Sequence, residues 1–411
     1  MTATPIDEFV TLYEDLHRNP ELSFQETRTA GIVADRLRDL GYDVTTGVGR
    51  TGVVGVLANG DGPVVMLRAD MDALPVEEKT GLPYASSVRA TGEDGTEVPV
   101  MHACGHDVHV TCLLAACDLL AAERSTWSGT LLAVFQPAEE TVGGARAMID
   151  DGIFDRFGTP VVVLGQHVAP IPAGAIGLRA GATFAATDAL RVVLHGRGGH
   201  GSRPEATVDP VVMAASTILR LQTIVSREVA ATETAVVTIG TVHAGIASNV
   251  IPDQAELGVN IRTFSDDVRA TVLAAVERIV RGEAAAAGAP TEPEIVTVMA
   301  APAVVNDADA VARTSAALAT VALVVDPGVV TGSEDVGMFA TAAGAPCVFW
   351  LLGGADPAHF TAPPMSEEFM AQLRAVPSNH SPHYAPAPVP TLAIGRDALV
   401  AAAREWLSSA P

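Results

Sequence analysis

Short apolar runs alternate with stretches of helical periodicity in the first part of the chain. Four runs have the length and composition of buried strands: Val53–Ala58, Val64–Leu67, Leu131–Phe135 and Val161–Leu164. Helical stretches lie between or after most of them, notably Val108–Arg124 and Ala145–Asp150. This alternation favours an α/β layer with a largely parallel sheet. Ser23 followed by Glu26 fits a capping box, so we expect a helix that begins there and ends at Gly41.

The middle of the chain has a different order of elements. A strand at Ala189–His195 precedes a helix that starts at Asp209-Pro210, with Asp as cap and Pro in the first turn. The elements expected next are the strands Ala235–Val242 and Ala255–Phe264, a helix at Asp267–Ala287 and a strand at Ile295–Met299. The order β-α-β-β-α-β is the ferredoxin-like pattern, which can pack as a unit of its own.

These patterns predict a discontinuous domain organisation. We expect a mostly parallel-sheet catalytic domain in two parts, residues 1–185 and 300–411, with an inserted ferredoxin-like α+β small domain at residues 186–299. A length of 411 residues also favours about two domains. Such an insertion requires its two ends to lie close together, which is common.

Composition and charge narrow the classes of function. The formal net charge of −23 argues against a basic nucleic-acid-binding surface. Four cysteines in a chain of this length do not form a disulfide scaffold. The first twenty residues carry acids and no continuous apolar run, which argues against a signal peptide, and no stretch reaches the roughly 18 apolar residues of a membrane span. We therefore expect a cytoplasmic protein without a nucleic-acid or membrane partner.

The segment MHACGHDVH is the densest group of chemically active side chains. Cys104, His106 and His109 lie within six positions, and thiolate and imidazole are good ligands for zinc and similar ions. Gly105 permits a tight bend, so Cys104 and His106 could face one centre. Taken alone, the segment could also be a buried cysteine with capping residues at a helix start.

Polar groups follow the other predicted strands. Asp70 and Asp72 follow the second strand, Glu139 and Glu140 the third, and His167 the fourth. In open α/β sheets, sites form beyond the carboxyl ends of strands, so we expect these groups to converge. Adjacent carboxylates cannot easily face the same metal, so one would bind metal while the other accepts a proton from water.

Several motifs, spread over nearly the whole chain, resemble those of a known enzyme family. In order, they read HRNPELSFQE, LRADMDALP, MHACGHDVH, QPAEE, GGHGSRP, SNVIP, GSED and NHSPHY. They are similar to the di-metal amidohydrolases that include hippurate hydrolases, N-acyl-amino-acid aminoacylases and plant indole-acetyl-amino-acid hydrolases, within the aminoacylase and carboxypeptidase G superfamily. WSGT and LQTIVSREV resemble the subgroup that acts on long- or branched-acyl glutamine.

The resemblance implies a site for two divalent metal ions per subunit, zinc or manganese, with nickel or cobalt as alternatives. Its implied metal ligands are Cys104 as a thiolate bridging both ions, His106 and His167 on one ion, and Glu140 and His380 on the other. Glu139 would be the general base and later proton donor, and Asp72 would orient a ligand. The family pattern His-Ser-Pro-x-aromatic falls on His380, which leaves His383 in the variable position.

The small domain carries a glycine-rich segment with two possible interpretations. Gly196–Gly201 satisfies G-x-G-x-x-G after a strand, but Pro204 follows where a phosphate-binding helix should begin, so we reject a dinucleotide site. The resemblance instead makes His200 a ligand of the transition state. Glu205 stands where relatives usually have His, and its effect on specificity stays open.

The implied reaction is amide hydrolysis of N-acyl amino acids, which gives a carboxylic acid and a free amino acid. The resemblance also implies that Asn249 and Arg262 hold the substrate carboxylate, and that the chain is a homodimer paired through the small domain. The alternatives are a metal-dependent dipeptidase in which Asp70 or Glu334 receives the substrate amine, a cysteine hydrolase with Cys104 as nucleophile, and a binding protein whose metal is structural. The acyl group, the amino acid and the native metal stay open.

Overall fold

A computed structural model describes residues 4–92, 94–364 and 366–409. The chain divides into two compact units. The large unit comprises Met1–Thr183, Val305–Gly328 and Asp335–Pro411, and the small unit comprises Phe184–Val304 and Val329–Glu334.

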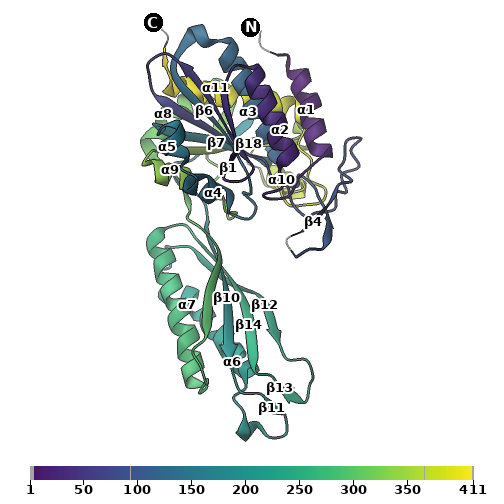
Figure 1. Ribbon diagram of the computed structural model, residues 1–411, viewed down its shortest axis with the longest axis vertical. Coiled ribbons are helices and arrows are strands. Elements are labelled where there is room, and N and C mark those ends of the chain that lie inside the picture. Colours follow the sequence, from purple (N-terminus) through teal and green to yellow (C-terminus); the bar gives the residue numbers. More distant parts are fainter. Residues whose placement is uncertain (1–3, 93, 365, 410–411) are drawn as a thin grey trace. The chain divides into compact units, whose positions relative to one another are not determined.

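A nine-stranded sheet forms the centre of the large unit within the described residues (Figure 1). In spatial order its strands are β1 (Asp43–Val48), β2 (Gly52–Asn59), β6 (Trp127–Gln136), β3 (Val64–Asp70), β7 (Val162–Pro172), β18 (Cys347–Ala355), β8 (Ala175–Gly177) and β17 (Leu323–Val325), with β19 (Ser408–Ser409) paired to β6. The central strands β6, β3, β7 and β18 are parallel. The sequence-based expectation of a mostly parallel sheet is confirmed.

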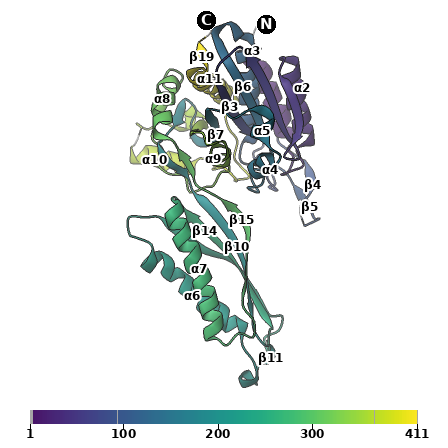
Figure 2. The same ribbon diagram turned by 60° about the vertical axis from the view of Figure 1, so that its left-hand side comes forward.

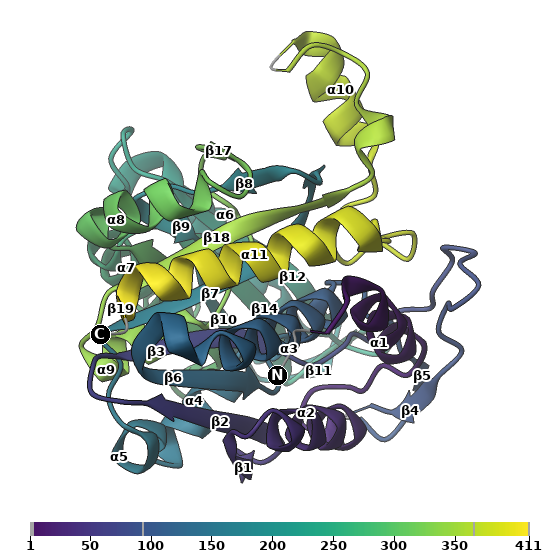
Figure 3. The same ribbon diagram turned by 90° about the horizontal axis from the view of Figure 1, so that it is seen from above.

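Helices pack on this sheet because the central strands are buried along most of their length. The helices of the large unit are α1 (Ile6–Arg18), α2 (Thr27–Asp39), α3 (His106–Ala122), α4 (Gly144–Asp150), α5 (Ile153–Phe157), α8 (Ala308–Leu318), α9 (Gly337–Ala343), α10 (Glu367–Ala375) and α11 (Pro388–Trp406). Figure 3 shows α11 running along β7 and β18 beside α3 and α8. Helix α3 is apolar around most of its circumference and is almost entirely buried, which places its N-terminus inside the unit.

The capping box expected at Ser23 and Glu26 was wrong. Helix α2 begins at Thr27, and the Glu26 side chain forms no cap bond. Ser23 Oγ instead donates to Asp72 Oδ2 at 2.7 Å, and Glu26 Oε1 accepts the Ala138 N–H at 2.8 Å. Gly41 does follow the helix in the left-handed region at φ 82°, as expected of a C-terminal stop.

The small unit has the expected β-α-β-β-α-β order. Its antiparallel sheet consists of β12 (Ala235–Ala244), β14 (Gln254–Thr263), β10 (Ala186–His195) and β15 (Glu294–Ala301), in this spatial order. Helices α6 (Pro210–Thr223) and α7 (Asp266–Ala286) lie side by side on one face of it (Figure 2). Asp209 caps α6 by accepting the Val211 N–H at 2.8 Å, as predicted.

The described residues also form three two-stranded ribbons. They are β4 (Arg89–Thr91) with β5 (Glu97–Pro99), β9 (Gly181–Phe184) with β16 (Val304–Asn306), and β11 (Gly199–His200) with β13 (Val250–Ile251). Strand β11 of the last ribbon lies within the glycine-rich segment Gly196–Gly201. Gly199 and His200 are extended and pair with the SNVIP segment, so no phosphate-binding helix start forms there.

Candidate metal centre and catalytic residues

The polar groups that follow the central strands converge at one edge of the large sheet, together with the start of α3. Asp70 ends β3, Glu139 follows β6, and His167 lies within β7, which extends farther than the apolar run predicted. Gly105 has φ 82°, and a Cβ atom there would lie 2.4 Å from Val168 Cγ1. Only glycine therefore permits the bend that places Cys104 and His106 on the same side.

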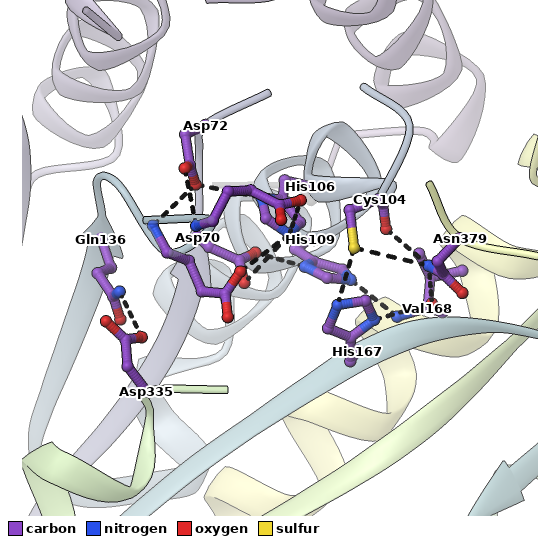
Figure 4. Close-up of polar contacts among 12 residues, drawn as sticks. Asp70, Asp72, Cys104, His106, His109, Gln136, His167, Val168, Asp335 and Asn379 are labelled. Atoms are coloured by element: carbon purple, nitrogen blue, oxygen red, sulfur yellow. Dashed lines mark hydrogen bonds and ion pairs between the residues drawn. The ribbon is translucent and has the colours of Figure 1, made fainter. Parts of the chain in front are cut away.

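Two groups of candidate ligand atoms share Cys104. One comprises Cys104, His106 and His167, which are labelled in Figure 4, and the other comprises Cys104, Glu140 and His380; within each, the ligand atoms all lie within 4.8 Å of one another. Cys104 Sγ is 3.4 Å from His167 Nε2, and His380 Nε2 is 3.3 Å from Glu140 Oε2. The Cys104 sulfur atom would be shared between the two groups if each held an ion.

Two buried atoms of this cluster fit a cation. His106 Nε2 and Glu140 Oε1 are inaccessible to solvent and have no hydrogen-bond partner in the described part of the chain. Buried polar atoms without partners are costly, and a divalent ion would satisfy both. Thiolate, imidazole and carboxylate are donors that zinc accepts.

Burial controls the charge of these groups. It raises the pKa of the Cys104 thiol well above its usual range and raises the pKa of Glu140 to about 7. Burial also lowers the pKa of His167, which favours the neutral imidazole that a metal requires. Desolvation therefore opposes a free thiolate at Cys104, and a nearby cation would favour it.

Asp72 joins His106 to the loop that carries the paired glutamates. Its carboxylate accepts the Glu139 and Glu140 N–H groups at 3.1 and 3.0 Å. Its Oδ1 atom lies 3.3 Å from His106 Nδ1. Because one carboxylate contacts both sides, it holds the imidazole and the glutamate loop in a fixed relation.

A second buried carboxylate, Asp70, is engaged on both oxygens. It accepts from Arg68 Nη1 at 2.7 Å and from His109 Nδ1 at 2.5 Å. His109 Nε2 accepts the Val168 N–H at 2.8 Å, so the ring proton belongs on Nδ1. His109 thus has no nitrogen left for a metal. Asp70 is also fully buried, which disfavours it as the acceptor of a substrate amine in a dipeptidase.

Arg68 anchors Asp70 to a larger buried network. Its Nε donates to Gln136 Oε1 at 2.8 Å and its Nη2 to Asp335 Oδ1 at 3.1 Å. Gln136 Nε2 also donates to Asp335 Oδ1, at 2.7 Å (Figure 4). The LRADMD and GSED segments are therefore joined by buried hydrogen bonds next to the candidate metal ligands. Both segments belong to the motifs of the family, but no local pattern in either one indicates this contact.

Sequence reasoning also overlooked Asn379, the residue before His380. Asn379 Nδ2 donates to the carbonyl oxygens of Cys104 and Val168 at 3.0 and 3.1 Å. His380 itself has φ 69°, a left-handed conformation that is uncommon outside glycine. His383, the nearby histidine in the same motif, is not part of either ligand group. Its Nδ1 atom lies 2.9 Å from the Lys79 carbonyl oxygen.

Comparison with known proteins assigns the family. Residues 66–376 match the model of peptidase family M20/M25/M40. The chain belongs to this family. Hippurate hydrolase of Campylobacter jejuni is 43% identical over 281 residues, which are 68% of this chain and 70% of that enzyme. N-acetylcysteine deacetylase of Bacillus subtilis is 39% identical over 69% of this chain and 72% of its own.

Solved structures of similar proteins have the same fold. A dinuclear metal binding peptidase of the M20 family from Bacillus subtilis is 30% identical, with a TM-score of 0.76 over 97% of both chains. A putative aminohydrolase from methicillin resistant Staphylococcus aureus is 29% identical, with a TM-score of 0.84 over 98% of this chain and 97% of that one. No helix in the described residues of this M20 family member is long and apolar enough to cross a membrane.

The remaining candidate residues of this M20 family member lie in the small unit. His200 is exposed, and its Nδ1 accepts from the Ser202 N–H at 3.1 Å and from Ser202 Oγ at 2.7 Å. In the neutral ring, the proton is therefore on Nε2, which can donate. Asn249 is exposed and its carbonyl oxygen accepts the Gly201 N–H at 2.8 Å. Arg262 is half-buried on β14.

Proposed function

We propose that the protein is a dinuclear metal-dependent amidohydrolase that converts an N-acyl amino acid and water to a carboxylic acid and a free amino acid. The observation that carries the proposal is the shared position of Cys104 between two ligand groups, with Glu139 beside them. Glu139 is buried, and its Oε2 lies 3.9 Å from His106 Nε2. The relatives named hippurate hydrolase and N-acetylcysteine deacetylase support this substrate class.

The residues of the large unit have separate roles in this proposal. The metal ligands would be Cys104, His106 and His167 for one ion, and Cys104, Glu140 and His380 for the other. When bound, two divalent ions lower the pKa of water and polarise the amide carbonyl. Glu139 takes the proton of the attacking water and passes it to the leaving nitrogen. Asp72 contacts both His106 and the backbone of Glu139, and it thereby fixes the position of the imidazole relative to the Glu139 loop.

The proposed native metal is zinc or manganese. The test is metal analysis of the purified protein, followed by activity of the apoprotein reloaded with zinc, manganese, nickel or cobalt. Loss of activity on chelation without an acyl-enzyme intermediate supports the metal mechanism. An acyl group trapped on Cys104 would instead support the cysteine hydrolase.

A substrate panel tests the reaction itself. We expect N-acyl amino acids with acetyl, benzoyl and longer acyl groups to be cleaved faster than dipeptides with the same amino acid. A clear preference for dipeptides would favour the dipeptidase, for which Glu334 remains a possible amine acceptor. No hydrolysis of either class by metal-loaded protein would favour a binding protein.

Arg262 and Asn249 are proposed to hold the substrate carboxylate. Arg262 is a half-buried cation that donates to two uncharged oxygen atoms, Asn260 Oδ1 and Ser333 Oγ. Amidating the substrate carboxylate should sharply lower kcat/KM for the native enzyme and matter little for Arg262→Ala. Equal hydrolysis of the acid and the amide by the native enzyme would contradict this role.

His200 is proposed to stabilise the oxyanion of the tetrahedral intermediate, in the active site of the partner subunit of a homodimer. Its exposed ring and its Nε2 proton support a donor role. The exposed valines Val236 and Val242 on the edge strand β12 support pairing through the small unit.

Subunit mixing tests this arrangement. His200→Ala and Glu139→Gln should each be nearly inactive. In a mixed dimer, both substitutions fall in one site and the other site is intact, so co-expression should restore up to about a quarter of native activity. No recovery, with mixing demonstrated by two affinity tags, would mean that His200 does not act across subunits.

A further inference from the structure

Strand β14 separates its side chains between two faces of the small sheet. Leu257, Val259 and Ile261 are buried in the core beneath the helices. Asn260 and Arg262 alternate with them and therefore lie on the opposite face, which no helix of this unit covers. Both are only partly buried.

Two neutral oxygen atoms hold the Arg262 guanidinium. Arg262 Nε donates to Asn260 Oδ1 at 3.1 Å, and Arg262 Nη1 donates to Ser333 Oγ. Asn260 Nδ2 in turn donates to Thr187 Oγ1 at 3.3 Å, and this contact directs the amide oxygen toward the arginine. The guanidinium plane is thus fixed by groups from two strands and the segment before Asp335.

Other arginines of the same unit are neutralised by carboxylates. Arg269 forms two bonds of 2.7 Å with Asp188, and Arg191 lies 3.0 Å from Glu256. Arg262 differs because the groups that accept its hydrogen bonds, the Asn260 amide and the Ser333 hydroxyl, carry no charge. Neutral acceptors orient a cation without cancelling its field, so the charge is retained for a ligand.

We propose that Asn260 and Ser333 are positioning residues that fix Arg262 in an orientation suited to a carboxylate and leave its charge available. The inference rests on the proposed role of Arg262 as the carboxylate anchor. Nη2 has no hydrogen-bond partner in the part of the chain that the structure describes, so it can form one arm of a bidentate bond. Asn260 thereby determines specificity for substrates with a free carboxylate.

The sharpest variant is Asn260→Asp, which keeps an acceptor at the same place but adds a negative charge. The new carboxylate would pair with Arg262 and compete with the substrate. We expect KM for an N-acyl amino acid to rise about 10- to 100-fold, with kcat at saturation changed less than about threefold. The same substrate with an amidated carboxylate should show no such rise. Asn260→Ala, which loses orientation but not charge, should raise KM by less, about 3- to 10-fold.

Gln254→Asp is the matched control. Gln254 is exposed at the other end of β14 on the same face, so this variant adds the same charge to the same strand away from Arg262. It should leave KM within about twofold of native, because exposed charges beyond roughly 10 Å are screened. Calorimetric binding of the free amino acid product gives a readout independent of turnover, and it should weaken in Asn260→Asp but not in Gln254→Asp.

The outcomes separate this inference from its premise. An unchanged KM in Asn260→Asp would overturn the inference about Asn260, and so would equal rises in KM for the acid and amide substrates. The role of Arg262 as the anchor would still stand in that case if Arg262→Ala abolishes the preference for a free carboxylate. If Arg262→Ala keeps the native preference for the free acid, the anchor fails and the inference fails with it. If native protein hydrolyses no N-acyl amino acid, the proposed function fails first.

Discussion

The candidate residues of the large unit and those of the small unit differ in burial and in the number of bonds that hold them. Cys104, His106 and Glu139 are 7%, 0% and 6% exposed, and the carboxylates around them bind backbone N–H groups or buried side chains. The exception in the large unit is His380, whose side chain is 57% exposed. His200 and Asn249 are exposed and are held only by contacts within their own loop and ribbon.

This difference matches the two proposed roles, which are metal binding in the large unit and substrate contact in the small unit. Metal ligands need fixed positions and little competing water, which burial and interlocking bonds supply. Groups that meet the substrate must be accessible before it arrives. Substitutions in the large unit should therefore alter metal binding, stability or the chemical step, whereas substitutions in the small unit should alter turnover and binding alone.

Glu139→Gln should give the largest effect. It keeps the shape of the side chain but removes the proton acceptor, so turnover should fall about 10²- to 10⁴-fold, or further if Glu139 also protonates the leaving amine. Metal content should stay at the native value by elemental analysis. Near-native turnover in a metal-loaded variant would contradict the assignment.

His17→Leu tests how strongly the buried polar contacts of the large unit stabilise it. His17 lies 2.7 Å from Asp107 and 3.1 Å from Glu78, all without solvent exposure. Burial alone would lower the pKa of His17, but the two carboxylates outweigh it and raise the pKa to about 10. Removing the cation leaves two buried acids unpaired, so the free energy of unfolding should fall by about 3–5 kcal/mol.

The pH dependence of this loss has a definite sign. A folded pKa above the unfolded value gives stability that is fully present below pH 6.5 and is lost as the pH rises through about 10. The difference in unfolding free energy between native protein and His17→Leu should therefore shrink over that range in denaturant titrations. His359→Leu, at an exposed histidine, is the control and should show no such trend.

His200→Ala tests whether the exposed residues of the small unit act on the substrate alone. Loss of one oxyanion donor costs about 10²- to 10³-fold in kcat. Because His200 is exposed, the melting temperature and the metal content should stay native. Loss of metal in this variant would place His200 among the structural supports rather than the substrate-facing residues.

Glu26→Gln should have the smallest effect. Burial, reinforced by the charge of Asp72, raises the pKa of Glu26 from 4.5 to about 7. The folded protein therefore holds a proton that the unfolded chain releases, and stability falls as the pH rises from 4.5 to 7. Glutamine lacks this loss, so the variant should be more stable above pH 7 by up to about 3 kcal/mol and similar below pH 4.5, at constant metal loading. A parallel pH profile for both proteins would contradict the shift.

The arrangement of strands was predictable because it depends on local periodicity. The alternation of buried and open positions in β14 and the capping residue of α6 are both visible in the sequence. The convergence of Asp72, Glu139 and His167 followed from one general property of parallel sheets. His167 was placed after its strand rather than within it because the apolar run ends before the hydrogen-bonded ladder does.

Other features depended on partners far away in the sequence. Ser23 and Glu26 have the spacing of a capping box, but their side chains bond Asp72 and Ala138 instead, and no local pattern distinguishes the two cases. Asn379 and the Arg68 network were missed for the same reason. His380 lies in an irregular loop and could be selected only through the family motif.

The central claim is that Cys104 bridges two metal ions, and metal stoichiometry tests it most directly. The chain has three other cysteines, all buried, of which Cys112 and Cys117 lie in α3 and Cys347 begins β18. Each should be replaced by serine and the metal content measured after equilibration with a limiting concentration of free metal. The account predicts two ions per chain in the native protein and in Cys112→Ser, Cys117→Ser and Cys347→Ser, with both ions weakened in Cys104→Ser. Two tightly bound ions in Cys104→Ser would contradict it.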